Sequence, residues 1–367
     1  MNNDQIDNNT IGSTMQQTDK KCPNCGGTMD FDPSTGMLKC PYCESEFEIS
    51  ALGGKPLNGM EADFSSAEFK ENCDWGTATR TIICKSCGGE TLYDANTLSS
   101  VCPYCGSNQV METQSNTIAP FGVCTFKVAK NTASEKFRKW LKKKIFCPSK
   151  AKKSCMPESF KGIYVPIWTF DTDTVSDFTA RYGIDRSYTD SKGDTHTRTD
   201  WYSVSGTHRE FIDDHPIIAT DRYDTAMFKS LLPFDTAHNL SYDPQYLAGF
   251  AAEKYSVGLN DGWERAKKSI AEVLKASISD EIKRKKHADK VDGIRMSTIY
   301  NEIKYKYLLA PVWISSFKYK NKIYNFMVNG ETGKVAGKSP VSPLRVVIAV
   351  LLGILLFIIL LKIFTIL

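Results

Sequence analysis

The sequence predicts an α+β protein with two small cysteine-rich ribbons at its N-terminus, a mixed α+β domain with a duplicated β unit, and one C-terminal transmembrane helix. Three observations lead to this prediction: a repeated cysteine pattern, strand and helix patterns in the middle of the chain, and a long apolar run at its end. The predicted organisation is a disordered tail over 1–20, ribbon 1 over 21–49, a linker over 50–78, ribbon 2 over 79–112, the α+β domain over 116–338 and the transmembrane helix over 345–367.

Eight cysteines form two copies of one motif, in which a CxxC pair is followed after fourteen residues by a second CxxC pair. Each cysteine of the first copy recurs 62 positions later, as Cys22 does at Cys84. Four thiolates suit a closed, tetrahedral, structural zinc site, and glycines follow three of the four pairs, where a tight turn needs them. We therefore predict two zinc ribbons with one structural zinc ion each, held by Cys22, Cys25, Cys40 and Cys43 in ribbon 1 and by Cys84, Cys87, Cys102 and Cys105 in ribbon 2.

A disulfide framework would use the same cysteines. The spacing is nevertheless typical of zinc modules, and the sequence shows no secretory signal. Reduced thiolates imply a reducing compartment, and ribbons this small need the metal in order to fold. The remaining cysteines are interpreted as buried thiols: Cys73, Cys124, Cys147 and Cys155.

Two helices are predicted in the α+β domain. Ser134 can cap a helix that carries Phe137, Trp140 and Leu141 on one face. A longer helix begins near Asp261 and has one apolar stripe along its length. The stripe consists of Trp263, Ala266, Ile270, Val273, Leu274, Ile278 and Ile282.

Strand patterns are predicted over 163–170, 175–184, 201–212, 305–319 and 323–328. Two of these strands share a pattern, because Val165–Phe170 and Ala310–Phe317 are both apolar and both carry a proline two residues before a tryptophan. This similarity predicts a duplicated β unit with helices on one side. The aromatic residues of both stretches are expected in the core.

The last 22 residues, from Val346 to Leu367, are apolar except for Lys362 and Thr365. As a helix they would span about 33 Å, close to the ~30 Å hydrocarbon core of a bilayer. Lys334, Lys338 and Arg345 precede the run, which orients that side toward the cytoplasm. We therefore expect a single-pass tail anchor in the cell membrane, with the N-terminal bulk of the chain in the cytoplasm.

The distribution of charge separates the ribbons from a basic segment. Residues 20–49 hold three basic and five acidic side chains, and residues 84–112 hold one and three, so each region has a net charge of −2. Phosphate binding requires the opposite sign, so the ribbons are interpreted as protein-binding or structural modules. Residues 127–153 hold eleven basic side chains and one acidic one, a net charge of +10.

Three uses of the basic segment remain open. With its interleaved aromatic residues it can contact anionic lipid, or a nucleic acid could use the same charges. Alternatively, the segment is a solvated helix whose aromatic face packs on the domain core. The candidate basic surface consists of Lys136, Arg138, Lys139, Lys142, Lys143 and Lys144.

No intact catalytic motif is found. The run Thr332–Ser339 is one residue short of a phosphate-binding loop, and Pro340 and Pro343 follow where that loop needs a helix. His208 and His215, with the acidic residues near them, form a loose cluster of the kind that on strands and turns is more often ordinary surface charge than a site. An enzyme whose site lies in the α+β domain is kept only as a second alternative.

The two cysteine motifs resemble those of a bacterial family called the transcription-factor-IIB-type zinc-ribbon-containing proteins. The stretches Lys161–Asp171, Ala248–Leu259 and Phe326–Val335 are similar to this family too, so the resemblance extends from Lys21 to about Lys338. The family's role is not established. Some members carry a replication-restart helicase name, but this sequence lacks the phosphate-binding loop, the acid box and the length that such an enzyme requires. The resemblance implies functional roles for the eight ribbon cysteines alone.

Taken together, the sequence predicts a membrane-anchored cytoplasmic adaptor or scaffold. Two zinc ribbons on a mobile N-terminal arm would present a surface to a protein partner, and the basic helix would hold the domain near the bilayer. The alternative is a membrane-tethered nucleic-acid-binding protein that uses residues 127–153. The identity of the partner and the oligomeric state do not follow from the sequence.

Overall fold

The computed structural model describes residues 21–49, 61–65, 79–84, 90–94, 110–113, 120–149, 160–319 and 322–366. The predicted tail over 1–20, most of the linker and most of ribbon 2 lie outside these residues, as do Cys73 and Cys155. The described part is a mixed α+β structure built on one large sheet, with a cluster of four cysteines near the N-terminus.

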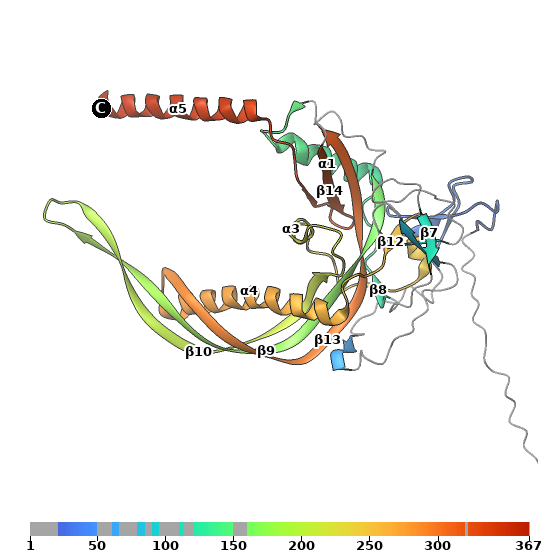
Figure 1. The fold of residues 1–367 in the computed structure, drawn as a ribbon, viewed down its shortest axis with the longest axis horizontal. Helices are drawn as coiled ribbons and strands as arrows, with labels where there is room; N and C mark the ends of the chain where they lie inside the picture. Colours follow the sequence, from blue (N-terminus) through green and yellow to red (C-terminus); the bar gives the residue numbers. More distant parts are fainter. Residues whose placement is uncertain are drawn as a thin grey trace, which may run out of the picture.

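Three long antiparallel strands form the frame of the molecule: β9 (Lys161–Thr189), β10 (Thr195–Ile218) and β13 (Lys290–Tyr319). β9 lies in the centre, with β10 on one side and β13 on the other. Their outer parts, residues 172–212 and 290–301, project from the body as a curved arm (Figure 1). This part is called the arm below.

The strand boundaries differ from the sequence prediction in three places, one of which is the strand predicted over 201–212, which runs over Thr195–Ile218. The predicted strands over 163–170 and 175–184 are one continuous strand, and the predicted strand over 305–319 begins at Lys290 instead. The added residues of β13 are mostly polar and show no buried run. They are extended because they pair with β9 across the arm, so tertiary context decides their conformation.

Short strands complete the sheets. β8 and β12 run parallel to β13 and β9, and β14 and β15 extend the sheet beyond β13. The strands of the body are β4 (Ala62–Asp63), β8 (Gly122–Val123), β11 (Leu240–Ser241), β12 (Ala251–Glu253), β14 (Lys322–Asn329) and β15 (Val335–Gly337). Those of the ribbons are β1 (Asp30–Asp32), β2 (Met37–Lys39), β3 (Glu46–Phe47), β5 (Thr79–Cys84), β6 (Glu90–Asp94) and β7 (Val110–Thr113).

The helices are α1 (Lys130–Lys143), α3 (Thr225–Lys229), the 3₁₀ turn η3 (Pro244–Leu247), α4 (Leu259–Lys286) and α5 (Pro343–Ile366). α1 begins four residues before Ser134, so the predicted cap is wrong, and Ser134 is buried within the helix. α4 covers one face of the arm with the predicted stripe (Figure 1). Val273 is the exception: it is 40% exposed, because it lies at the margin of a stripe that repeats every three or four residues.

The order of elements repeats along the body. β8, α1, β9 and β10 follow one another in the first half, and β12, α4, β13 and β14 follow one another in the second. The two similar stretches noted in the sequence lie side by side, with Val165 opposite Ala310 in antiparallel register. Both tryptophans are buried and donate a hydrogen bond to a backbone carbonyl, Trp168 to Val257 and Trp313 to Val128.

Ribbon 1 is packed against the body. The Phe31 backbone N–H donates to the carbonyl of Ala248, and the Phe31 ring contacts Tyr246 edge-on with the ring centroids 5.8 Å apart. Phe31 is buried in the same core cluster as the aromatic residues of the body. The sequence predicted that the ribbons would lie on a mobile N-terminal segment. This expectation is wrong for ribbon 1, because an aromatic side chain in its hairpin joins the main core.

The C-terminal helix α5 begins two residues before the predicted segment and leaves the body as a separate rod (Figure 1). Its side chains are described for 343–354 and 356–359, and the large apolar ones from Val346 onward are exposed. Within the residues that the structure describes, no helix is both long and apolar enough to cross a membrane. The predicted transmembrane helix therefore stays a prediction.

Candidate metal centre

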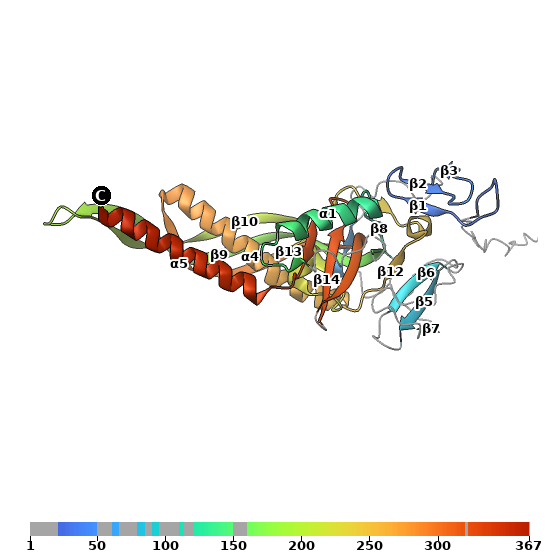
Figure 2. The same ribbon diagram turned by 90° about the horizontal axis from the view of Figure 1, so that it is seen from above.

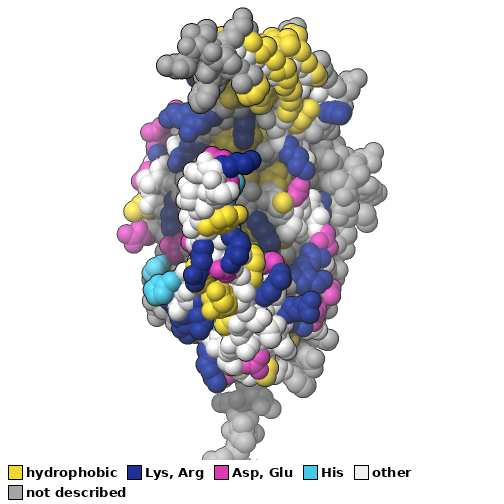
Figure 3. Space-filling model, turned by 90° about the vertical axis from the view of Figure 1, so that its left-hand side faces the viewer, with side chains coloured by type: hydrophobic (Ala, Val, Ile, Leu, Met, Phe, Trp, Pro, Cys, Tyr) yellow, Lys and Arg dark blue, Asp and Glu magenta, His cyan; other side chains and the backbone are white. Residues whose placement is uncertain are grey.

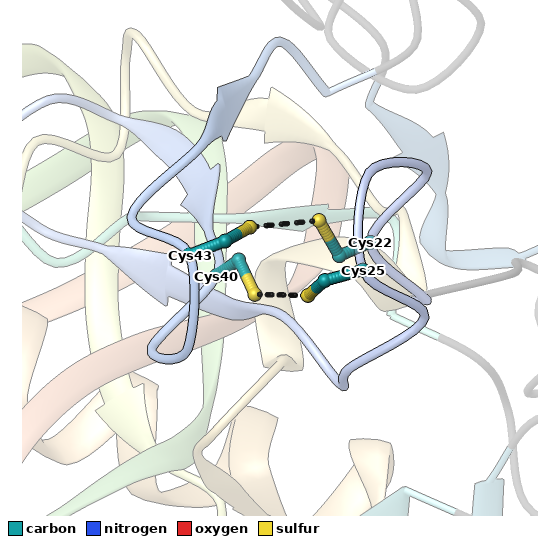
Figure 4. Close-up of side chains that lie close together, drawn as sticks. All are labelled: Cys22, Cys25, Cys40 and Cys43. Carbon is teal, nitrogen blue, oxygen red and sulfur yellow. Dashed lines mark hydrogen bonds between the residues drawn. The ribbon is translucent and has the colours of Figure 1, made fainter.

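Ribbon 1 brings its four cysteines together at one point (Figure 4). The four Sγ atoms lie within 4.8 Å of one another, and both the Cys22–Cys43 and the Cys25–Cys40 Sγ pairs are 3.4 Å apart. Tetrahedral zinc bonds of ~2.3 Å would place the sulfurs about 3.8 Å apart, whereas a disulfide requires about 2.05 Å. The four cysteines are free thiols arranged to hold one metal ion.

Tight backbone turns position the sulfurs. In the first CxxC pair the Gly26 N–H donates to the Cys22 carbonyl, and in the second the Glu44 N–H donates to the Cys40 carbonyl. Both turns place the residue after the second cysteine at positive φ, +73° for Gly26 and +59° for Glu44. Glycine adopts this region freely, whereas a residue with a Cβ atom there costs roughly 1–2 kcal/mol. Glu44 stands where the first turn has a glycine, and it nevertheless adopts the same type of turn.

The surroundings of Cys43 favour a thiolate. Cys25 differs, because against the lowering effect of the Gly27 N–H, hydrogen bonds with Cys40 and Cys43 raise the pKa of its thiol. Cys22 and Cys40 are buried, while Cys25 and Cys43 face solvent. The Ser45 hydroxyl and backbone N–H both face Cys43 and lower the pKa of its thiol to about 6, and Ser45 also accepts a hydrogen bond from Asn24. A soft, negatively charged sulfur donor set of this kind suits a thiophilic divalent ion with no coordination position left open.

The second predicted site lies largely outside the described residues. Cys84 ends strand β5, but Cys87, Cys102 and Cys105 are not among the residues that the structure describes. The backbone of ribbon 2 joins the main sheet, because β6 pairs with β12. A second metal ion therefore stays a prediction.

The candidate basic surface lies on α1 and the turn that follows it. Arg138, Lys139, Lys142, Lys143 and Lys144 are exposed. Lys136 is half-buried, and its amine donates to the Thr332 carbonyl.

The aromatic face of α1 packs on the core. Phe137 is fully buried and stacks on Phe326 with the ring centroids 3.7 Å apart, and Trp140 stacks on Phe137. Phe146, beyond the helix, is 40% exposed. Of the interleaved aromatic residues, Phe137 is thus buried, Trp140 is half-buried and Phe146 is the most exposed.

The loose histidine cluster does not form one site. His208 lies between Glu210 on its own strand and Glu281 on α4, so it joins the helix to the sheet. Burial lowers the pKa of His208, but the two carboxylates raise it by more, and the net direction is upward. His215 points elsewhere and is kept neutral, because burial lowers its pKa to about 4.

A buried charged cluster was not found from the sequence. Asp171 on β9, Asp214 on β10, Lys306 on β13 and Glu61 just before β4 meet where the arm joins the body. The Lys306 amine lies 2.7 Å from Asp214 and 3.6 Å from Glu61, and its side chain is almost fully buried. Four segments supply these residues, so no local spacing could reveal them. Their one sequence signal is charge within otherwise apolar strands.

Comparison with known proteins identifies a relative in a bacterium. The chain is 30% identical over 326 residues to the uncharacterized protein YdjG of Bacillus subtilis (strain 168), an alignment that covers 88% of this chain and 90% of YdjG. No family model matches the sequence, and no solved structure matches it. The chain therefore belongs to the same family as YdjG of Bacillus subtilis.

Proposed function

We propose that this protein is a zinc-stabilised adaptor or scaffold, anchored by α5 in the cell membrane with its bulk in the cytoplasm. The observation that carries the proposal is the apolar surface of α5. Twelve of its side chains, from Leu344 to Ile359, are large, apolar and 36–69% exposed. A rod with exposed apolar groups all round is not stable in water, and a bilayer is the cover that fits its shape.

The position of α5 supports this reading. The helix leaves one end of the molecule, and both ribbons lie at the other end (Figure 2). Figure 3 looks onto the side toward which α5 projects and shows apolar side chains gathered on α5, with Lys and Arg side chains spread over the surface below it. Lys334, Lys338 and Arg345 precede the apolar part, which favours a cytoplasmic body.

The ribbons supply the proposed binding surface. Zinc is the ion that best suits four thiolates, and the repeat of the motif supports two structural zinc ions per chain. The resemblance to the transcription-factor-IIB-type zinc-ribbon proteins supports the same assignment. On ribbon 1 the Tyr42 ring is 76% exposed beside the cysteine cluster, with Glu44 and Glu46 nearby in the chain. An exposed aromatic group among carboxylates suits a neutral or basic protein partner.

Membrane fractionation tests the anchor. The full chain is expected in the membrane pellet and should resist high salt and alkaline carbonate, which strip peripheral proteins. Deletion of 343–367 should move the protein to the supernatant with its metal content unchanged. Deletion of 2–20, which removes a similar length from the other end, serves as the matched control and should leave the protein in the pellet. Release of the full chain by carbonate would contradict the proposal.

Intact-protein mass spectrometry under native conditions tests the metal. We expect a mass increase of two zinc ions for the full chain and of one for the Cys40→Ser variant. A chain that carries no zinc after expression in zinc-supplemented medium would contradict the assignment.

A further inference from the structure

The structure selects one of the three uses that the sequence left open for the basic segment, and it adds the turn after α1 to that use. We infer that residues 142–146 form a second membrane contact beside α5, in which Ile145 and Phe146 insert at the level of the lipid headgroups and Lys142, Lys143 and Lys144 bind anionic phosphates. This inference rests on the proposed function, because it requires that α5 enters a bilayer.

The turn is held at the base of α5. The Arg345 guanidinium donates to the carbonyl oxygens of Ile145 and Cys147, at 3.0 and 2.6 Å, and to the Ser149 hydroxyl at 2.7 Å. The Ser342 N–H donates to the Phe146 carbonyl at 2.9 Å. Four hydrogen bonds thus fix the turn where α5 begins, and both views of the ribbon place α1 beside that point (Figures 1 and 2).

Two apolar side chains on this turn face solvent. Ile145 is 76% exposed and Phe146 is 40% exposed, although the aromatic face of the preceding helix is packed on the core. Val341 and Leu344, on the α5 side, are exposed as well. Two segments of the chain therefore place exposed apolar side chains around the base of α5. If this region faced water, polar side chains would be expected there.

The lysines complete an interfacial pattern. Lys142, Lys143 and Lys144 are exposed and consecutive, and α1 carries one acidic side chain, Glu135. Lys144 lies over the Trp140 ring, 4.7 Å from its centroid, which keeps its amine next to the turn. Cations that flank exposed apolar residues are the arrangement that binds an anionic bilayer surface. Nucleic acid could use the charges, but it offers nothing to cover Ile145 and Phe146 beside an apolar helix.

Site-specific photocrosslinking of the full chain in lipid nanodiscs tests the inference. Three variants each carry one photoreactive residue: Phe146→p-benzoylphenylalanine on the turn, Leu352→p-benzoylphenylalanine in α5 and Tyr42→p-benzoylphenylalanine on ribbon 1. Each is reconstituted in neutral phosphatidylcholine nanodiscs and in nanodiscs that also contain anionic phosphatidylglycerol, whose surface attracts polybasic segments. Crosslinks to lipid are then measured by mass spectrometry.

The expected result is lipid crosslinking from position 352 in both nanodiscs, and at least fivefold more crosslinking from position 146 in the anionic ones. Combining Lys142→Gln, Lys143→Gln and Lys144→Gln should reduce that preference to less than twofold. Lys283→Gln, Arg284→Gln and Lys285→Gln at the end of α4 remove the same charge and should leave the preference intact.

The opposing outcomes are distinguishable. If position 352 crosslinks to lipid but position 146 gives no more than position 42, the inference is wrong and the anchor stands. If position 352 gives no lipid crosslink, the proposed function fails and the inference fails with it. With duplex DNA added, transfer of the position 146 crosslink from lipid to DNA would overturn the inference in favour of nucleic-acid binding.

Discussion

Asp171 occupies an unusual position for a carboxylate, because it is buried where two β-bulges meet. The register of β10 against β9 shifts between Ile212 and His215, and that of β13 against β9 shifts between Asn301 and Lys304. Bulges bend and twist a sheet, and here they mark the change from body to arm. Asp171 accepts a hydrogen bond from the backbone N–H of Asp214, which lies in one of these bulges at φ +46°.

The balance of charge in this cluster makes Asp171 the excess carboxylate. Lys306 already pairs with Asp214 and lies near Glu61, which also pairs with Lys304. Burial raises the pKa of Asp171 to about 7, against the lowering effect of the Asp214 N–H and with a further rise from the Glu61 carboxyl. Asp171 is therefore expected to share a proton with Glu61 rather than to carry a charge at mildly acidic pH.

This argument predicts the effect of Asp171→Asn on stability. A carboxyl whose pKa is raised on folding binds its proton more tightly in the folded state, so it lowers the free energy of unfolding as pH rises from about 4 to about 7. Asparagine has the shape of the protonated carboxyl but does not ionise, so it does not cause this fall in the free energy of unfolding. The variant should be more stable than the natural protein by roughly 1–3 kcal/mol at pH 8 and about equal to it at pH 4.5, as measured by urea unfolding.

The control for this measurement is Asp177→Asn, which removes an exposed carboxylate from the same strand. It measures what the loss of an exposed carboxylate does to stability at the two pH values, and only the difference between the two variants is assigned to burial of Asp171. If Asp171→Asn instead destabilises the protein at pH 8, Asp171 is charged and contributes to holding Lys306.

Among the elements, ribbon 1 shows how much a local motif can predict. The CxxC spacing predicts the four ligands, because two tight turns and a short hairpin suffice to bring the sulfurs together. The place of the ribbon on the body could not be predicted in this way. Phe31 reaches a pocket formed by Tyr246 and Phe250, more than 200 residues away in the sequence, and nothing near Phe31 indicates those partners.

Docking and metal binding should therefore be separable. Phe31→Ala removes a buried ring from the interface, a change that costs about 3–5 kcal/mol in a packed core, but it leaves all four ligands in place. We expect the variant to retain its zinc, while hydrogen exchange becomes faster in residues 29–39 and 246–251. Tyr42→Ala, an exposed ring on the same ribbon, should change neither quantity. Loss of zinc in Phe31→Ala would mean that the site depends on the body for its stability.

The longest elements were the least predictable ones. The apolar stripe of α4 follows helical periodicity, so the sequence shows it directly. The first half of β13 carries a weaker signal, because half-buried Ile294, Met296 and Tyr300 alternate with exposed residues. Its partner is β9, with Arg295 opposite Thr179 and Thr298 opposite Ser176. Pairing between residues more than 100 positions apart leaves no local signal. The charged cluster at the bulges escaped prediction for the same reason.

The whole molecule combines a repeated body with two projections. The body consists of two halves with the same order of elements, a short strand, a helix and two further strands. Each half pairs its short strand with a long strand of the other half, because β12 pairs with β9 and β8 pairs with β13. The buried tryptophans make matching hydrogen bonds across these pairs. Both ribbons join the body near β12, and the arm and α5 project from the opposite end (Figure 2).

The arm and α5 extend in the same general direction (Figure 1), and this geometry constrains membrane insertion. Ion pairs cover the outer part of the arm, including Arg186 with Asp200 and Lys290 with Asp185. Each ion placed in hydrocarbon costs several kcal/mol, so the arm cannot enter a bilayer beside α5. Insertion therefore requires the axis of α5 to turn away from the arm, about the end that Arg345 holds on the turn after α1.

The last prediction is that the tip of the arm stays in water on the cytoplasmic side when α5 is inserted. In sealed inverted vesicles, Lys192→Cys in the hairpin between β9 and β10 should react fully with a membrane-impermeant maleimide. Ile354→Cys, in the middle of α5, should react only after detergent is added, because hydrocarbon shields it. The native cysteines are distinguished by peptide mass spectrometry. Protection of position 192 together with position 354 would mean that arm and helix keep the parallel arrangement, which is incompatible with a membrane-spanning α5 and would place both along the bilayer surface instead.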